Sequence, residues 1–181
     1  HVCPWWLCFT FDNLIRKLFH NPENILAPYV HEGDTVLDVG PGMGYFSIPL
    51  ARMVGDKGKV IAADVQAPML AALRKRVQKQ GLEGRMVLHL CKPDSIGIRD
   101  PIDFALAFWM VHEVPDRNKF FHEIRLLLKP TGKLMLAEPM IHVTRPMFED
   151  TLQRAEEVGF TVTENPKISM SRTAVLSLRG G

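Results

Sequence analysis

The chain has 181 residues, a length that predicts one domain rather than two. Apolar residues make up 46% and charged residues 23%, the proportions of an ordinary globular protein with enough material for a core. Lys and Arg number 22 against 20 Asp and Glu, and a formal net charge of +2 argues against a dedicated nucleic-acid binder.

The sequence carries no sign of a membrane span or a targeting segment. It has no uninterrupted run of about 18 apolar residues, so we expect no transmembrane helix. The apolar opening at residues 5–9 is short and lacks a basic lead, which argues against a signal peptide. Three cysteines are too few for a disulfide scaffold and fit a reducing compartment. We predict a cytoplasmic protein, monomeric or homodimeric, that binds neither membranes nor nucleic acid.

Strands and helices are predicted to alternate along most of the chain. Helical spacing at residues 11–19 and a short helix from Pro22 to near Tyr29 suggest an N-terminal helical cap over residues 1–30. Short apolar or β-branched runs then predict strands at 35–39, 59–64, 86–90, 102–108, 133–137, 161–163 and 174–178. Helices are predicted at 45–54, from Pro68 to Gly81, from Asp116 to 128, and at 146–158.

This alternation predicts an α/β fold. Five βα units followed by two closing strands imply a mostly parallel sheet with helices on both faces, formed by residues 31–181. In such sheets the ligand binds beyond the carboxyl ends of the strands. We therefore expect the functional residues in the loops after Val39, Ala63, Leu90, Phe108 and Ala137.

The loop after the first predicted strand is rich in glycine. Glycines at 40, 42 and 44 allow turns closed to other residues and a close approach of a ligand to the backbone. A dinucleotide fingerprint needs its third glycine one position later, where this chain has Tyr45. Asp38, two positions before the first glycine, would repel a pyrophosphate but attract an ammonium group.

A second acidic residue, Asp64, ends the second predicted strand, 20 residues after Gly44. A carboxylate at this place can accept hydrogen bonds from both hydroxyls of a ribose. The two loops together indicate a ligand with a ribose and a positive charge but no phosphate. S-adenosylmethionine has these features.

These motifs resemble those of class I S-adenosylmethionine-dependent methyltransferases, particularly the small ubiquinone-biosynthesis-type and arsenite-type enzymes. Residues 36–44 are similar to the family's first motif, 60–64 to its second, 102–115 to its fourth, and 126–139 to its helix, turn and fifth strand. The resemblance implies a Rossmann-like seven-stranded sheet whose last strand is antiparallel and inserted beside the fifth.

The resemblance also implies which residues bind the cofactor. Asp38 and the glycine loop would hold the methionine end, Asp64 the ribose, and Val65 or Met69 the adenine. After the third strand Lys92 cannot accept a hydrogen bond, so Asp94 or a backbone carbonyl would contact the adenine amino group. The expected cofactor-binding residues are Asp38, Gly40, Pro41, Gly42, Gly44, Asp64, Val65, Met69, Cys91, Lys92 and Phe108.

His112, in the loop after the fourth strand, is the candidate catalytic residue. An imidazole there could take a proton from a hydroxyl or thiol, although it could also only pack the loop. Glu113 could orient it, but we expect a surface carboxylate. The residues expected around the acceptor are Trp5, Trp6, Trp109, His112, and Met140 or His142; the two N-terminal tryptophans could instead form a hydrophobic clasp or a dimer contact.

Because the core uses nearly all residues, a small-molecule acceptor is expected. One alternative is a metalloid methyltransferase using Cys3, Cys8 and Cys91, since soft centres favour sulfur ligands, although we predict no metal site. Another is a regulatory subunit that binds the cofactor without catalysis. An NAD-type oxidoreductase is disfavoured by Tyr45 and Asp38.

Overall fold

The computed structural model describes residues 20–180, so the helix predicted at 11–19 lies outside the described residues. The strands are β1 (Thr35–Val39), β2 (Lys59–Asp64), β3 (Met86–Leu90), β4 (Ile102–Phe108), β5 (Leu128–Pro139), β6 (Phe160–Glu164) and β7 (Ser171–Leu178). The helices are α3 (Pro22–Leu26), α4 (Ser47–Met53), α5 (Ala67–Lys79), α6 (Arg117–Leu127) and α7 (Arg145–Glu157), with short 3-10 turns η1 (Glu83–Arg85) and η2 (Val111–Glu113).

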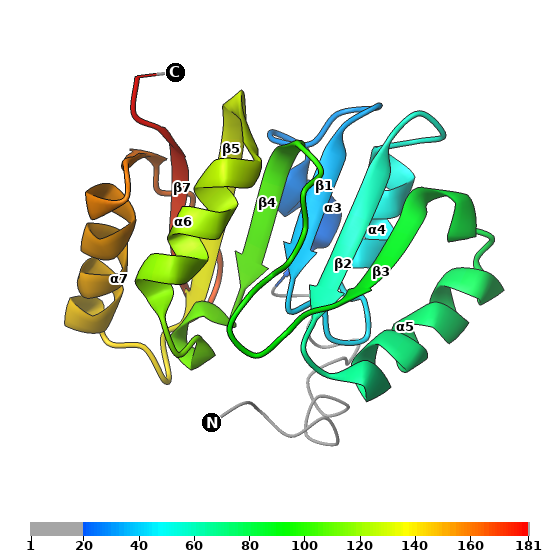
Figure 1. The fold of residues 1–181 in the computed structure, drawn as a ribbon, viewed down its shortest axis with the longest axis horizontal. Helices are drawn as coiled ribbons and strands as arrows, with labels where there is room; N and C mark the ends of the chain where they lie inside the picture. Colours follow the sequence, from blue (N-terminus) through cyan, green and yellow to red (C-terminus); the bar gives the residue numbers. More distant parts are fainter. Residues whose placement is uncertain (1–19, 181) are drawn as a thin grey trace.

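The seven strands form one sheet in the order β3-β2-β1-β4-β5-β7-β6 (Figure 1). Neighbouring strands from β3 to β5 are parallel, whereas β7 lies between β5 and β6 and is antiparallel to both. The predicted Rossmann-like sheet, with its last strand inserted beside the fifth, is therefore confirmed.

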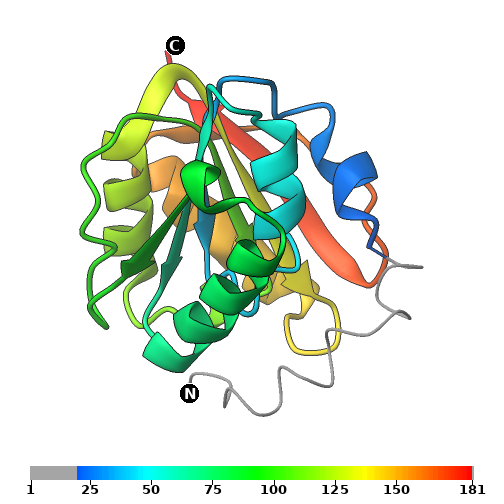
Figure 2. The same cartoon turned by 90° about the vertical axis from the view of Figure 1, so that its right-hand side faces the viewer.

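Helices cover both faces of this sheet, as predicted. Alternate residues of β1 point to opposite faces: Val36 packs in one core with Leu50 and Leu73, whereas Leu37 packs in the other with Phe121. The first core contains side chains of α3, α4 and α5, and the second contains those of α6 and α7. Figure 2 shows the sheet between α6 on one side and α3 and α4 on the other.

The prediction of five βα units was wrong in one place, because no helix forms in residues 91–101 between β3 and β4. Helix α4 begins at Ser47, two residues later than predicted, after the turn at Gly44. Strand β5 begins at Leu128 and includes the predicted turn at 130–132, with an irregular register against β4 at this end. No helix within residues 20–180 is long and apolar enough to cross a membrane.

Candidate functional site

Two neighbouring cavities lie beyond the carboxyl ends of the parallel strands, where the sheet topology places a ligand. The first cavity has a volume of about 450 Å³ and the second about 460 Å³, sizes typical of sites for small molecules. Both are lined by Gly40, Gly42, Trp109 and Glu113, so they meet at the glycine loop and at the loop after β4.

The glycines of this loop have left-handed backbone conformations, with φ of +67° at Gly40, +55° at Gly42 and +90° at Gly44. A Cβ atom added to Gly42 would meet no atom within 4 Å, so the backbone there is open to a ligand. A Cβ atom on Gly44 would lie 2.3 Å from Cδ1 of Leu73. Gly44 lines neither cavity and permits close packing of α5, which differs from the predicted contact with the cofactor.

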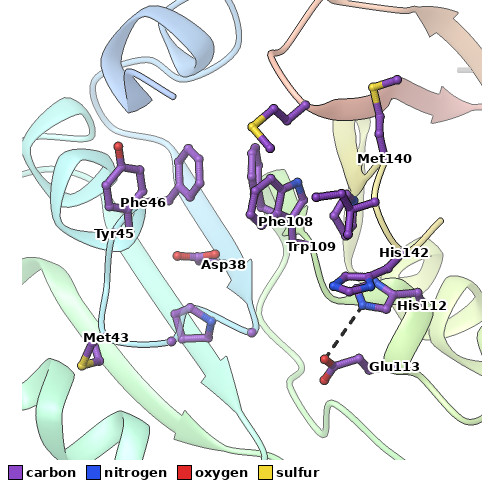
Figure 3. Close-up of a pocket in the computed structure, with 16 residues that line it drawn as sticks. Asp38, Met43, Tyr45, Phe46, Phe108, Trp109, His112, Glu113, Met140 and His142 are labelled. Atoms are coloured by element: carbon purple, nitrogen blue, oxygen red, sulfur yellow. Dashed lines mark ion pairs between the residues drawn. The ribbon is translucent and has the colours of Figure 1, made fainter. Parts of the chain in front are cut away.

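Asp38, near the end of β1, brings a carboxylate to the first cavity. Its side chain is buried, and Oδ2 accepts a hydrogen bond of 2.5 Å from the Ser47 hydroxyl at the start of α4. In Figure 3 the Phe46 ring lies above the carboxylate, and Phe108 and Trp109 lie to its right. A buried carboxylate attracts cations, and the face of an aromatic ring can do the same.

Asp64, at the end of β2, occupies the corresponding place in the second cavity. Its Oδ1 accepts a 2.8 Å hydrogen bond from the Gln66 N–H. Burial raises the pKa of the Asp64 carboxyl, while the backbone N–H groups of Gln66 and Gly42 act in the opposite direction. The same cavity is lined by other predicted residues, namely Val65, Met69, Cys91, Lys92 and Asp94.

His112, in η2, is held by a carboxylate that the sequence analysis did not identify. The Nδ1 atom of His112 is 2.5 Å from Oε2 of Glu138, a buried residue near the end of β5. The second oxygen of Glu138 accepts a 2.8 Å hydrogen bond from the Val111 N–H. The hydrogen bond to Glu138 raises the pKa of His112, and burial opposes this effect.

Glu113 is not the residue that orients His112, although the two are neighbours in sequence. Its Oε1 is 3.9 Å from Nε2 of His112, longer than a hydrogen bond (Figure 3). The side chain is half-buried and lines both cavities, so it is not the surface carboxylate that we expected. Glu138 directly follows the predicted strand at 133–137, in a loop where functional residues were expected, but no local pattern pairs it with His112.

The other residues predicted around the acceptor line the first cavity together, namely Trp109, Met140 and His142. The rings of His112 and His142 are stacked with centroids 6.3 Å apart. Trp109 has a left-handed backbone with φ of +60°, and its indole Nε1–H donates a 2.9 Å hydrogen bond to Ser171. Trp5 and Trp6 lie outside the described residues.

Other residues of the first cavity were only partly predicted. Phe108, predicted to bind the cofactor, lines the first cavity together with Asp38. Tyr45, Phe46 and Met170 also line this cavity and were not predicted as site residues. No local sequence pattern marks Met170 as a site residue, because it reaches the first cavity only through the pairing of β7 with β5.

Comparisons with known proteins agree with this geometry. A family model described as a methyltransferase domain matches residues 36–132, which is more than half of the chain. The chain belongs to the class I S-adenosylmethionine-dependent methyltransferases. S-adenosylmethionine is the cofactor of this family.

Among solved structures, the chain resembles a SAM-dependent methyltransferase from Aquifex aeolicus, with a TM-score of 0.86. The two sequences are 28% identical, and the match covers 97% of this chain and 98% of that one. The chain is 32% identical over 115 residues to the ubiquinone/menaquinone biosynthesis C-methyltransferase UbiE of Cellvibrio japonicus, covering 63% of this chain and 46% of that protein. The UbiE protein of Haemophilus ducreyi is 27% identical over 140 residues, covering 77% and 52%. The chain thus spans about half the length of these curated relatives.

The residues of the two cavities fit S-adenosylmethionine. The second cavity offers a buried carboxylate at Asp64, and the first offers one at Asp38 beside aromatic rings. Gly42, which lines both cavities, leaves space where a side chain would stand. A ligand with ribose hydroxyls at one end and positive charges at the other matches this distribution.

The described residues give no support to the metalloid alternative. Burial, aided by the charge of Asp64, raises the pKa of Cys91 to about 12, so its thiol stays protonated at neutral pH. No group of three or more His, Cys, Asp or Glu side chains within residues 20–180 is arranged to hold a metal ion. Cys3 and Cys8 lie outside this range.

Proposed function

We propose that this chain transfers a methyl group from S-adenosylmethionine to a small-molecule acceptor. The observation that carries the proposal is the pair of adjoining cavities, each with a buried carboxylate, which meet at Gly42 and Trp109. When bound, S-adenosylmethionine supplies a methyl group on a positively charged sulfur, which needs no further activation. The protein then has to align the acceptor with this methyl group and exclude water.

In this proposal the second cavity holds the adenosine. Asp64 accepts hydrogen bonds from the ribose hydroxyls, and Met69, which is buried beneath the same cavity, packs on the adenine. Asp38 and the backbone of Gly40 and Gly42 hold the methionine end, where the carboxylate faces the ammonium group. The Ser47 hydroxyl donates a hydrogen bond to this buried carboxylate and holds it in place.

The first cavity, beyond the methionine end, receives the acceptor. Its walls are mostly aromatic and methionine side chains, including Phe46, Phe108, Trp109 and Met140. Such walls favour an acceptor whose carbon skeleton is largely apolar. Among the polar side chains that line this cavity, we assign the role of base to His112.

Calorimetry with S-adenosylmethionine and with NAD tests the assignment of the ligand. We expect binding of S-adenosylmethionine and none of NAD; the reverse result would overturn the assignment. Incubation of the protein with metabolite extracts and S-adenosylmethionine labelled in its methyl group then tests transfer. Cofactor binding with no labelled product from any extract would instead indicate a regulatory subunit.

His112→Ala separates catalysis from cofactor binding. We expect turnover to fall by about 100-fold or more, the scale of a lost general base, while S-adenosylmethionine affinity is kept. His122→Ala on α6 is the matched control, since that histidine lines neither cavity and is not expected to change turnover. Normal turnover of His112→Ala would reduce His112 to a packing role.

A further inference from the structure

We propose that Glu138 is a positioning residue that fixes His112 with Nε2 as the base of the first cavity, and that the acceptor therefore loses a proton from the atom that is methylated. The inference rests on the proposed function and adds to it the chemical class of the acceptor. It is carried by the contacts of Glu138 with His112 and Val111, by the place of His112 in the lining of the first cavity, and by the charges around the ring.

The contacts of Glu138 determine which ring nitrogen carries a proton. Oε1 accepts from the Val111 N–H at 2.8 Å, and Oε2 lies 2.5 Å from Nδ1 of His112. An ionised carboxylate only accepts hydrogen bonds, so Nδ1 must be the protonated nitrogen. In the neutral ring Nε2 then has the free electron pair, which is the form needed to take a proton.

The ring is also held in its orientation. Val111 and His112 are consecutive residues of η2 and both bond to the same carboxylate, so Glu138 ties the turn as well as the ring to the end of β5. The ring of His142 stacks on that of His112, and both histidines line the first cavity. In Figure 3 the His112 ring lies beside His142 at the edge of this cavity.

The proposed step moves one proton and no electrons. The bond between the acceptor atom and its hydrogen breaks, the electron pair stays on the acceptor atom, and an N–H bond forms at Nε2 of His112. The resulting imidazolium is stabilised by the adjacent carboxylate of Glu138. An acceptor that is already deprotonated at neutral pH would need no such base. The acceptor class is therefore a proton-bearing nucleophile, that is, a weakly acidic hydroxyl or thiol or an activated C–H group.

Charged groups on β5, η2 and α6 act on His112. Glu138 on β5 and Glu113 on η2 favour the protonated ring, whereas burial and Arg117 on α6 disfavour it; His142 lies in the loop after β5. Because the hydrogen bond to Glu138 is the largest effect, the pKa of His112 is raised. Removal of the Glu138 charge should therefore lower it.

Nitrogen-15 NMR of the histidine rings tests the proposal without any acceptor. In the unmodified chain we expect neutral His112 to carry its proton on Nδ1, with signals assigned by their loss in His112→Gln. Glu138→Gln should lower the pKa of His112 and populate the Nε2–H tautomer. Glu113→Gln is the matched control, and it should leave the tautomer unchanged, because that carboxylate is 3.9 Å from Nε2.

A neutral His112 protonated on Nε2 in the unmodified chain would overturn the proposal, even if Glu138→Gln failed to fold. An unchanged pKa and tautomer in a folded Glu138→Gln variant would overturn it as well. With an acceptor from the labelling screen, the rate should rise with pH as His112 loses its proton. Glu138→Gln should reduce kcat by about 10-fold or more and move this rise to lower pH, with the KM for S-adenosylmethionine unchanged.

The two proposals fail in different ways. Absence of S-adenosylmethionine binding in calorimetry would refute the proposed function whatever the NMR result. Methyl transfer that is equally fast in Glu138→Gln at every pH would refute only the role of Glu138 and the acceptor class.

Discussion

Replacing Asp64 by Asn should stabilise the protein without ligand and weaken its binding of S-adenosylmethionine. Burial raises the pKa of this carboxyl, so the charged form is less favourable in the folded chain than in the unfolded one. The Asn oxygen still accepts the Gln66 N–H bond, which is 2.8 Å long, while the cost of the buried charge is removed. Loss of a charged partner for buried hydroxyls costs about 1.5–3 kcal/mol, or roughly 10- to 150-fold in Kd.

The pH dependence of stability tests separately whether the ionised Asp64 carboxylate destabilises the folded chain. The destabilisation by ionised Asp64 is largest above its raised pKa and disappears as pH falls toward the ordinary Asp value of about 4. Thermal unfolding from pH 4 to 8 should therefore show Asp64→Asn more stable than the wild type at neutral pH, with a gap that closes on acidification. Calorimetry measures the loss of affinity.

The matched control is Asp100→Asn. Asp100 contacts Lys59 at the opposite end of β2, with Nζ and Oδ1 2.6 Å apart, far along the strand from the cavities. This variant should leave the affinity for S-adenosylmethionine unchanged. Lower stability of ligand-free Asp64→Asn at neutral pH, or unchanged affinity, would refute the reasoning that the carboxylate is kept there for binding at a cost in stability.

Three further substitutions test the site and its support. Gly44→Ala should lower the free energy of unfolding by roughly 1–3 kcal/mol in urea titrations, because alanine is strained at a φ of +90° and its Cβ would lie 2.3 Å from Cδ1 of Leu73; unchanged stability would contradict both effects. Gly42→Ala has space for its Cβ, so it should cost only about 1–2 kcal/mol of backbone strain while weakening S-adenosylmethionine binding in calorimetry. Asp116→Ala should cost about 1 kcal/mol, since its side chain accepts the Lys119 N–H at 2.9 Å and caps α6; its ligand affinity should not change.

Much of the fold could be predicted from local patterns. Strands β1 to β4 have the bounds read from the sequence, because each is a short apolar run between turn residues. On α5 the buried side chains, Met69, Leu70, Leu73 and Val77, follow the helical spacing of apolar residues in the sequence, since that spacing fixes which face is apolar. The start of β5 was not predicted, because Leu128 pairs with Ile102 of β4 across an irregular stretch that contains Pro130 and Gly132, and such a long-range pair leaves no local pattern.

The sequence by itself also indicated the ligand-binding end of the sheet, since Asp38, Asp64 and the glycine loop lie at the carboxyl ends of strands that local patterns encode. Only the tertiary structure decided that Glu138 holds His112, although 26 residues separate them. The parallel register of β4 and β5 pairs Phe108 with Ala137, so the residues that follow the two strands meet. Such a contact depends on strand pairing over a long stretch of chain, which no local pattern specifies.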